Sequence, residues 1–375
     1  NRSADVIKES DGLYTVGFGI LGCPVPPGGC PCGAGAYNHR RAVRDRRFGG
    51  SGVVAIVAGV DEAGVGSVLG PLVVSASAFE VPDSAVDECL WKLLAPAVTR
   101  KFARKSAALV IGDSKKLYNR KSPRALWPLE RGVLAMLHTR RQCPTTLGDL
   151  LVGVTRNAHD ESRTYPWYCP DGLPLPRCLG AVDVALAGNS LAVQMRKAGV
   201  RLLGIRAEPV FAGEFNRVVR ATRNKGTTVL DVTGRLLACL WRRSSSGQIR
   251  IHVDRQGGRM RYMGLLERVF DGCRFRILDE TDTRSAYEVS DQRRVAEVSF
   301  CVDAEDGCLP VALASMTSKY IRELFMAMLN AFWAGRVGGL ASTAGYYSDG
   351  RRFFGEIQPT MRKLEIHQDM LYRCR

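Results

Sequence analysis

Between residues 53 and 80, two apolar runs follow one another across a glycine-rich turn. Both runs are rich in β-branched residues, which is typical of strands buried on both faces. The first run ends at Asp61 and Glu62, so a rigid strand would deliver two adjacent carboxylates. Because neighbouring side chains of a strand point to opposite faces, Glu62 would share a site with Asp61 only where the strand ends or twists.

Apolar residues recur at helical spacing in several later stretches and alternate with polar ones in others. We expect helices at residues 84–105, 122–137, 183–198, 214–242 with an interruption near 225–226, and 308–333, and strands at 200–206 and 248–254. Residues 139–182 show no clear period and are interpreted as a long insertion. Strands that alternate with helices predict an α/β domain with a mixed sheet.

The ends of the chain differ in composition from its middle. Residues 1–50 are rich in Pro and Gly and contain clusters of Arg, which indicates a flexible basic arm. A main domain is expected at 51–335, followed by an extension at 336–375. No apolar run is long enough to span a membrane and no secretion signal is recognisable, so we expect a cytoplasmic protein without membrane association.

Charge and cysteine content narrow the class of partner. The chain has 53 Lys and Arg against 37 Asp and Glu, a net charge of +16, and nucleic acid is the commonest partner of such a surface. A merely soluble basic protein stays open as an alternative. Of the 12 cysteines, Cys23, Cys30 and Cys32 form a cluster but no paired C-x2-C spacing occurs, so we expect reduced thiols and no zinc site.

Five short motifs, taken in their order, resemble those of type 2 ribonuclease H, the ribonuclease HII family. They are GVDEAG at 59–64 with Gly70-Pro71, DSKKL at 113–117, Asp254 at the end of a strand, SMTSKYIRE at 315–323, and GYYS at 345–348. The resemblance spans residues 53–350 apart from 139–182. It implies a ribonuclease H-like mixed sheet flanked by helices, with 51–335 as the catalytic domain and 336–375 as a C-terminal helical extension that contacts the substrate.

The resemblance also implies an activity and a set of site residues. The activity is hydrolysis of the RNA strand of RNA/DNA hybrids by a monomeric enzyme that uses Mg²⁺ or Mn²⁺. Two such ions can activate a water and neutralise the leaving oxygen. The catalytic residues and metal ligands would be Asp61, Glu62, Asp254 and Glu323, with Asp61 bridging the ions. Contacts to the hybrid would come from Gly64, Val65, Gly66, Ser114, Lys115, Lys116, Lys319 and Tyr346.

Three positions depart from the family pattern. Val65 replaces an arginine, Glu323 replaces an aspartate, and Arg351 lies near the place of an expected histidine. These departures leave a second hypothesis open, a nucleic-acid-binding protein of the same fold with weak or no cleavage. A third is a nuclease or recombinase that acts on branched or duplex DNA.

Each acid also has an ordinary structural interpretation. Taken singly, Asp254 would be a solvated acid at a strand end and Glu323 a salt-bridge partner of Lys319 or Arg322. The acids at 303, 305 and 306 are interpreted as a loop cluster.

Overall fold

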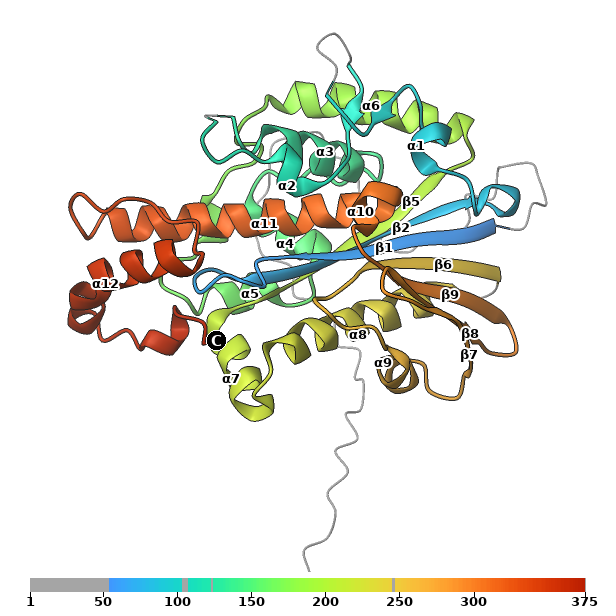
Figure 1. The fold of residues 1–375 in the computed structure, drawn as a ribbon. Helices are drawn as coiled ribbons and strands as arrows, with labels where there is room; N and C mark the ends of the chain where they lie inside the picture. The colour runs from blue at the N-terminus through green and yellow to red at the C-terminus, as the bar shows by residue number, and fades with distance from the viewer. Residues whose placement is uncertain (1–53, 103–106, 123, 245–246, 375) are drawn as a thin grey trace, which may run out of the picture. The chain divides into compact units, whose positions relative to one another are not determined.

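A seven-stranded mixed sheet runs through the structure, a computed structural model that describes residues 54–102, 107–122, 124–244 and 247–374 (Figure 1). In spatial order its strands are β5 (Arg201–Val210), β2 (Leu72–Pro82), β1 (Val54–Ala63), β6 (Gly247–Asp254), β9 (Arg294–Cys301), β8 (Arg284–Ser290) and β7 (Arg274–Glu280). β1 is antiparallel to β2 and parallel to β6, and β6 is parallel to β9. The sheet therefore has a parallel centre, at which the carboxyl ends of β1, β6 and β9 lie together.

Two hydrophobic cores cover the two faces of this sheet. The first lies under α11 (Leu309–Ala334), the long helix above the sheet in Figure 1. It also takes in α1 (Leu90–Leu93), α3 (Trp127–His138), α4 (Leu147–Val154) and α6 (Ala181–Lys197). The second lies under α7 (Ala212–Thr222), α8 (Lys225–Arg243) and α9 (Met263–Val269).

Successive side chains of strand β1 point to opposite faces of the sheet and so contribute to both cores. Its residues Ala55 and Val57 belong to the α11 side, whereas Ala58 and Val60 belong to the α8 side. Gly59 lets α11 approach closely, because a Cβ at this position would lie 2.1 Å from the backbone nitrogen of Val311. The helix is thereby held directly against the strand that carries the acidic pair.

Most of the predicted elements are confirmed. The α/β class with a mixed sheet flanked by helices is found, as are the strand pair at 53–80, the strands near 200–206 and 248–254, and the helices near 122–137, 183–198, 214–242 and 308–333. The predicted helix at 84–105 is wrong. In the described part of this segment, up to residue 102, the helical elements are η1 (Asp83–Ala85) and the single turn α1, because Pro96 cannot continue a helix. After it, β3 (Val98–Thr99) pairs with β4 (Leu109–Val110).

The aperiodic segment 139–182 contributes to the first core. Besides α4 it forms α5 (Ala158–Ser162) and η2 (Pro170–Gly172). Tyr165, Trp167 and Tyr168 are buried. Tyr165 and Tyr168 pack against Phe211, with ring centroids 5.1 and 5.6 Å apart, and Trp167 packs against Trp333 at 6.1 Å. Aromatic packing of this kind has no fixed sequence period, so the pattern did not predict it.

After α11 the chain forms α12 (Tyr347–Lys363) and η3 (Gln368–Met370). The last described residues, Arg373 and Cys374, are hydrogen-bonded to the turn between β1 and β2 and to α7. None of the helices in the described ranges is both long and apolar enough to cross a membrane. The predicted basic arm at 1–50, with Cys23, Cys30 and Cys32, lies outside the described residues.

Candidate active site

The register between strands β1 and β6 brings two of the predicted acids, Asp61 and Asp254, together. Val60 of β1 is paired with Val253 of the parallel strand β6, so the next residues, Asp61 and Asp254, lie side by side. Val60 and Val253 both point into the α8-side core. By alternation Asp61 and Asp254 therefore point to the α11 side, and Asp61 is buried there.

A third acid, Glu305, joins them from α10 (Ala304–Gly307). Strand β9 ends at Cys301, directly opposite Asp254, so the residues that follow β9 lie beside that aspartate. The backbone N–H of Ala304 donates to Asp254 Oδ1 at 3.1 Å, and the charge of Glu305 raises the pKa of Asp254. Glu305 is buried, with 3% of its surface exposed.

Glu62 reaches the same group although it points first to the other face. Its charge interacts with those of Asp254 and Glu305. The Oε2 atoms of Glu62 and Glu305 are both buried, and neither has a hydrogen-bond partner in the described part of the chain. Buried carboxylate oxygens without partners are unusual and point to a missing cation or donor.

Asp61, Glu62, Asp254 and Glu305 are called here the acid cluster. Holding all four of these carboxyl groups ionised is unfavourable, because they are buried and repel one another. Burial raises the pKa of Asp61 well above its ordinary range, and the charges of Glu62 and Asp254 raise it further. Burial and repulsion by Asp254 raise the pKa of Glu62 to about 8. Burial and repulsion by Glu305 raise the pKa of Asp254 to about 7. Divalent cations relieve such repulsion.

Mg²⁺ or Mn²⁺ fits the chemistry of this acid cluster. Both ions prefer oxygen ligands, and the cluster offers carboxylates with buried, unpartnered oxygens. Within the described ranges, however, no three or more His, Cys, Asp or Glu side chains are already arranged around one point as metal ligands. The structure thus supplies the donor set but not a preformed coordination shell.

Ser114 and Lys115 lie at the edge of the acid cluster, at the start of α2 (Ser114–Leu117). Ser114 Oγ is 2.9 Å from Ser315 Oγ, and the Ser315 hydroxyl partly offsets the rise in the pKa of Asp61. Lys115 Nζ is 3.5 Å from Glu305 Oε1, with its side chain largely exposed. Two predicted substrate residues are therefore beside the acids.

Lys116 is turned away from the acid cluster. Its ammonium group forms ion pairs with Asp306 at 2.9 Å and Asp113 at 3.4 Å.

Glu323, one of the four predicted ligands, lies in an ion pair with two cations. Its Oε1 accepts from Lys319 Nζ at 2.7 Å and from Arg322 at 3.0 Å, and its Oε2 accepts from the Tyr118 hydroxyl at 2.8 Å. Burial alone would raise the pKa of Glu323, but the two cations hold it below its ordinary value. The ordinary interpretation, an ion-pair partner of Lys319 and Arg322, describes Glu323 better, although the pair is buried rather than exposed.

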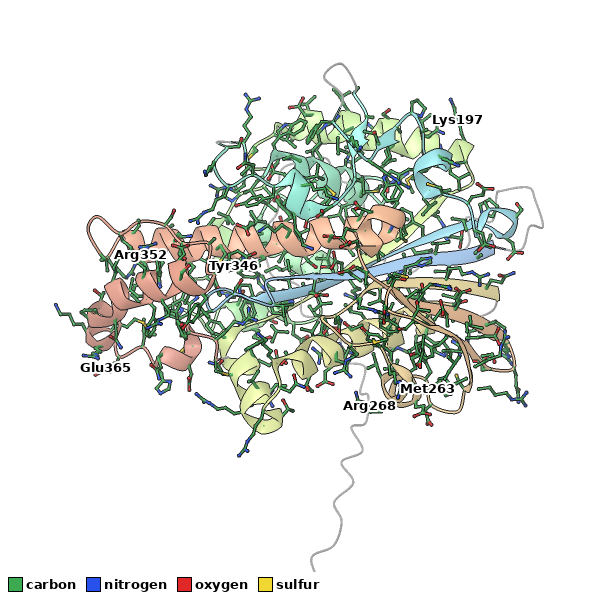
Figure 2. The ribbon with its side chains drawn as sticks, in the orientation of Figure 1. Lys197, Met263, Arg268, Tyr346, Arg352 and Glu365 are labelled. Atoms are coloured by element: carbon green, nitrogen blue, oxygen red, sulfur yellow. The ribbon has the colours of Figure 1, made fainter. Side chains whose placement is uncertain are left out.

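The remaining predicted contacts to the hybrid lie on the turn after β1 and at the start of α12. Gly64 has a φ of +91°, and a Cβ there would lie 2.5 Å from Arg322 Nε, so only glycine fits. Val65 is half-buried, whereas a Cβ on Gly66 would meet nothing within 4 Å. Tyr346 is 48% exposed at the start of α12 and bridges to the backbone of Ser67 (Figure 2).

The sequence pattern did not identify Glu305, the acid that completes the cluster. Strands β7, β8 and β9 were not predicted, so nothing placed residues 302–307 beside Asp254. The available signal was an alternating apolar pattern at 294–301 followed directly by acids, the same arrangement as at Asp61 and Asp254.

Comparisons with known proteins give only distant similarities. No protein-family model matches the sequence, and no curated protein matches it. Among solved structures, ribonuclease HII from Archaeoglobus fulgidus, in a complex with PCNA, is 17% identical, with 85% of this chain and 94% of that chain covered and a TM-score of 0.35.

Two crystal structures of Bst-RNase HIII are similar at the same level. A point mutant is 16% identical over 84% of this chain and 65% of that chain, with a TM-score of 0.42. A complex with Mn²⁺ is 14% identical, with 85% of this chain and 66% of that chain covered and a TM-score of 0.38. With TM-scores below 0.5, these similarities carry no argument, and function has to be argued from the site itself.

Proposed function

We propose that this chain is a metal-dependent endonuclease that hydrolyses the RNA strand of RNA/DNA hybrids, as a divergent member of the ribonuclease HII family. The observation that carries the proposal is the acid cluster at the carboxyl ends of the parallel strands β1 and β6. The order of the five motifs and the net charge of +16 support nucleic acid as the substrate.

The proposed metal ligands are Asp61, Glu62, Asp254 and Glu305, so Glu305 takes the place that the sequence had suggested for Glu323. Bound there, Mg²⁺ or Mn²⁺ would supply an activated water and charge neutralisation at the leaving oxygen. The backbone N–H of Glu62 donates to Asp61 Oδ1 at 2.6 Å. This contact fixes the direction of the acid before substrate arrives.

Other residues suit substrate binding rather than the chemical step. Lys115 is largely exposed beside the acid cluster and can meet a phosphate group. The exposed ring of Tyr346 can stack on a sugar or base. The ammonium group of Lys319 lies between Glu323 and the ring of Tyr118, 4.4 Å from the ring centroid. We therefore assign Lys319 to holding Glu323 and Tyr118 in place.

Cleavage of a labelled RNA/DNA hybrid in Mg²⁺ or Mn²⁺ tests the proposal. Wild type should cut the RNA strand, D61N should not, and D271N, which changes an exposed acid far along the chain, should cut like wild type. Competition with duplex DNA and duplex RNA reports the preferred substrate.

A second candidate is binding without efficient cleavage, favoured by the absence of a preformed coordination shell in the described residues. A wild-type protein that binds the hybrid but leaves it intact in both metals would establish that candidate instead.

A further inference from the structure

The last residues of the chain pack beneath the turn that follows the acidic pair. Tyr372 forms an antiparallel bridge with Leu69, and the N–H of Arg373 donates to the Val68 carbonyl at 2.8 Å. From α7, the Asn216 amide donates to the Tyr372 carbonyl at 2.8 Å. Residues 371–374, called here the C-terminal strap, are therefore fixed to both the turn and α7.

The strap places a buried arginine directly below the turn. The guanidinium of Arg373 donates to the carbonyls of Gly64 at 2.7 Å and Val65 at 3.3 Å, and lies 3.9 Å from the ring centroid of Phe215. Arg373 is fully buried and its Nε atom has no partner in the described part of the chain.

This arginine is charged and has no counter-ion among the described residues. Burial and the neighbouring charge of Arg322 lower the pKa of Arg373 to about 9, which still leaves it protonated at neutral pH. No ion pair joins it to a carboxylate of the described residues; its donors go to carbonyls. Because burying an unpaired charge is unfavourable, the site has a positive potential that an anion near the turn would balance.

The two hydrogen bonds also fix which way the turn presents its amides. In a trans peptide the C=O and the following N–H point in opposite directions. With the carbonyls of Gly64 and Val65 directed inward to Arg373, the N–H groups of Val65 and Gly66 point the other way. Neither N–H has an acceptor among the described residues, and the space at Gly66 is open.

We propose that Arg373 is a positioning residue that turns the Gly64–Gly66 backbone so that two adjacent N–H groups bind a phosphate of nucleic acid beside the acid cluster. Consecutive backbone N–H groups in a turn are a recurrent anion site. The resemblance places an arginine at the position of Val65, and here a guanidinium from the far end of the chain lies under the same turn. The inference rests on the proposed function for the identity of its ligand.

Binding without metal separates this role from cleavage. Affinity of a short RNA/DNA hybrid is measured by fluorescence anisotropy in EDTA over a range of salt, with R373Q, R373K and wild type. R373Q should weaken binding about 10-fold. It should also reduce the slope of log affinity against log salt concentration by about 1, the amount expected for the loss of one phosphate contact. R373K, which keeps the charge, should recover part of both.

Arg220 provides the matched control. It is exposed and ties the same end of the chain through an ion pair with Asp369 at 2.6 Å, without touching the turn. R220Q removes one positive charge and one anchor, and should bind the hybrid like wild type. R373Q that matches R220Q, or that weakens binding without a change in salt slope, would overturn the inference.

A second variant keeps the inference testable where R373Q does not fold. V65P deletes one of the two N–H groups and leaves Arg373 in place, so it should weaken binding; unchanged affinity would count against the phosphate site. A wild type that binds but does not cut refutes only the proposed function. A wild type that binds no nucleic acid refutes both.

Discussion

Glu305 and Glu323 are two buried glutamates with opposite surroundings. Glu323 has two cations and a hydroxyl on its oxygens, so its charge is fully compensated. Glu305 lies among other acids and keeps a buried oxygen without a partner in the described residues. Of the two, only Glu305 has an oxygen to offer to a metal ion.

The pair of variants E305Q and E323Q tests this difference at the residue scale. E305Q should lower kcat on the hybrid by more than about 100-fold, because even residues one step removed from a metal cost 10- to 100-fold. E323Q should retain most of kcat but unfold at a lower temperature, since it leaves Lys319 and Arg322 without their anion. Steady-state kinetics and thermal unfolding of both proteins decide between the two assignments; equal losses of kcat would contradict ours.

At the scale of elements, the contact of α11 with β1 determines where the acids lie. Ser318 of α11 donates to the carbonyl of Asp61 at 3.1 Å and is 2.8 Å from the Ser75 hydroxyl of β2. These buried contacts join the helix to the strand at the acidic pair. Gly59 makes them possible by leaving space for the first turn of the helix.

The variant G59A should therefore be destabilised by about 1 to 3 kcal/mol, because its methyl group would overlap the backbone of α11. Urea unfolding gives the free energy. G66A is the matched control, since its methyl group enters open space at a backbone conformation that alanine accepts, and it should stay within about 0.5 kcal/mol of wild type. Equal stability of the two variants would show that the close approach of helix and strand is not required.

At the scale of the whole molecule, the basic excess and the acid cluster are complementary features. A net charge of +16 favours a polyanion, while the acid cluster would repel the same polyanion unless cations occupy it. Nucleic-acid binding should therefore weaken steeply with salt, as several phosphates are contacted.

Metal removal should alter the stability of the entire protein. In EDTA, D61N should unfold at a higher temperature than wild type, because it removes one member of a repelling group. Mn²⁺ at about 100 times its Kd should stabilise wild type by about 2.7 kcal/mol and D61N far less. Differential scanning calorimetry with and without Mn²⁺ gives both quantities. A wild type that Mn²⁺ leaves unchanged would contradict the assigned ligands.

The sequence by itself determined the features that depend on local pattern. Apolar runs predicted β1 and β2, alternation predicted β6 and helical spacing predicted α11, and with them the positions of Asp61 and Asp254 at strand ends. It failed at the 84–105 segment, where Pro96 overrides the helical spacing, and at β7 to β9, three consecutive strands of which only β9 pairs with a strand distant in the chain, β6.

Only the tertiary structure decided which acids meet and what lies under the turn. Register between β6 and β9 places Glu305 beside Asp254, and Lys319 and Arg322 both pair with Oε1 of Glu323. Arg373 reaches Gly64 across 309 positions of sequence. A periodic pattern reports which side of an element is buried, whereas the identity of the opposing side chain depends on how distant elements pack.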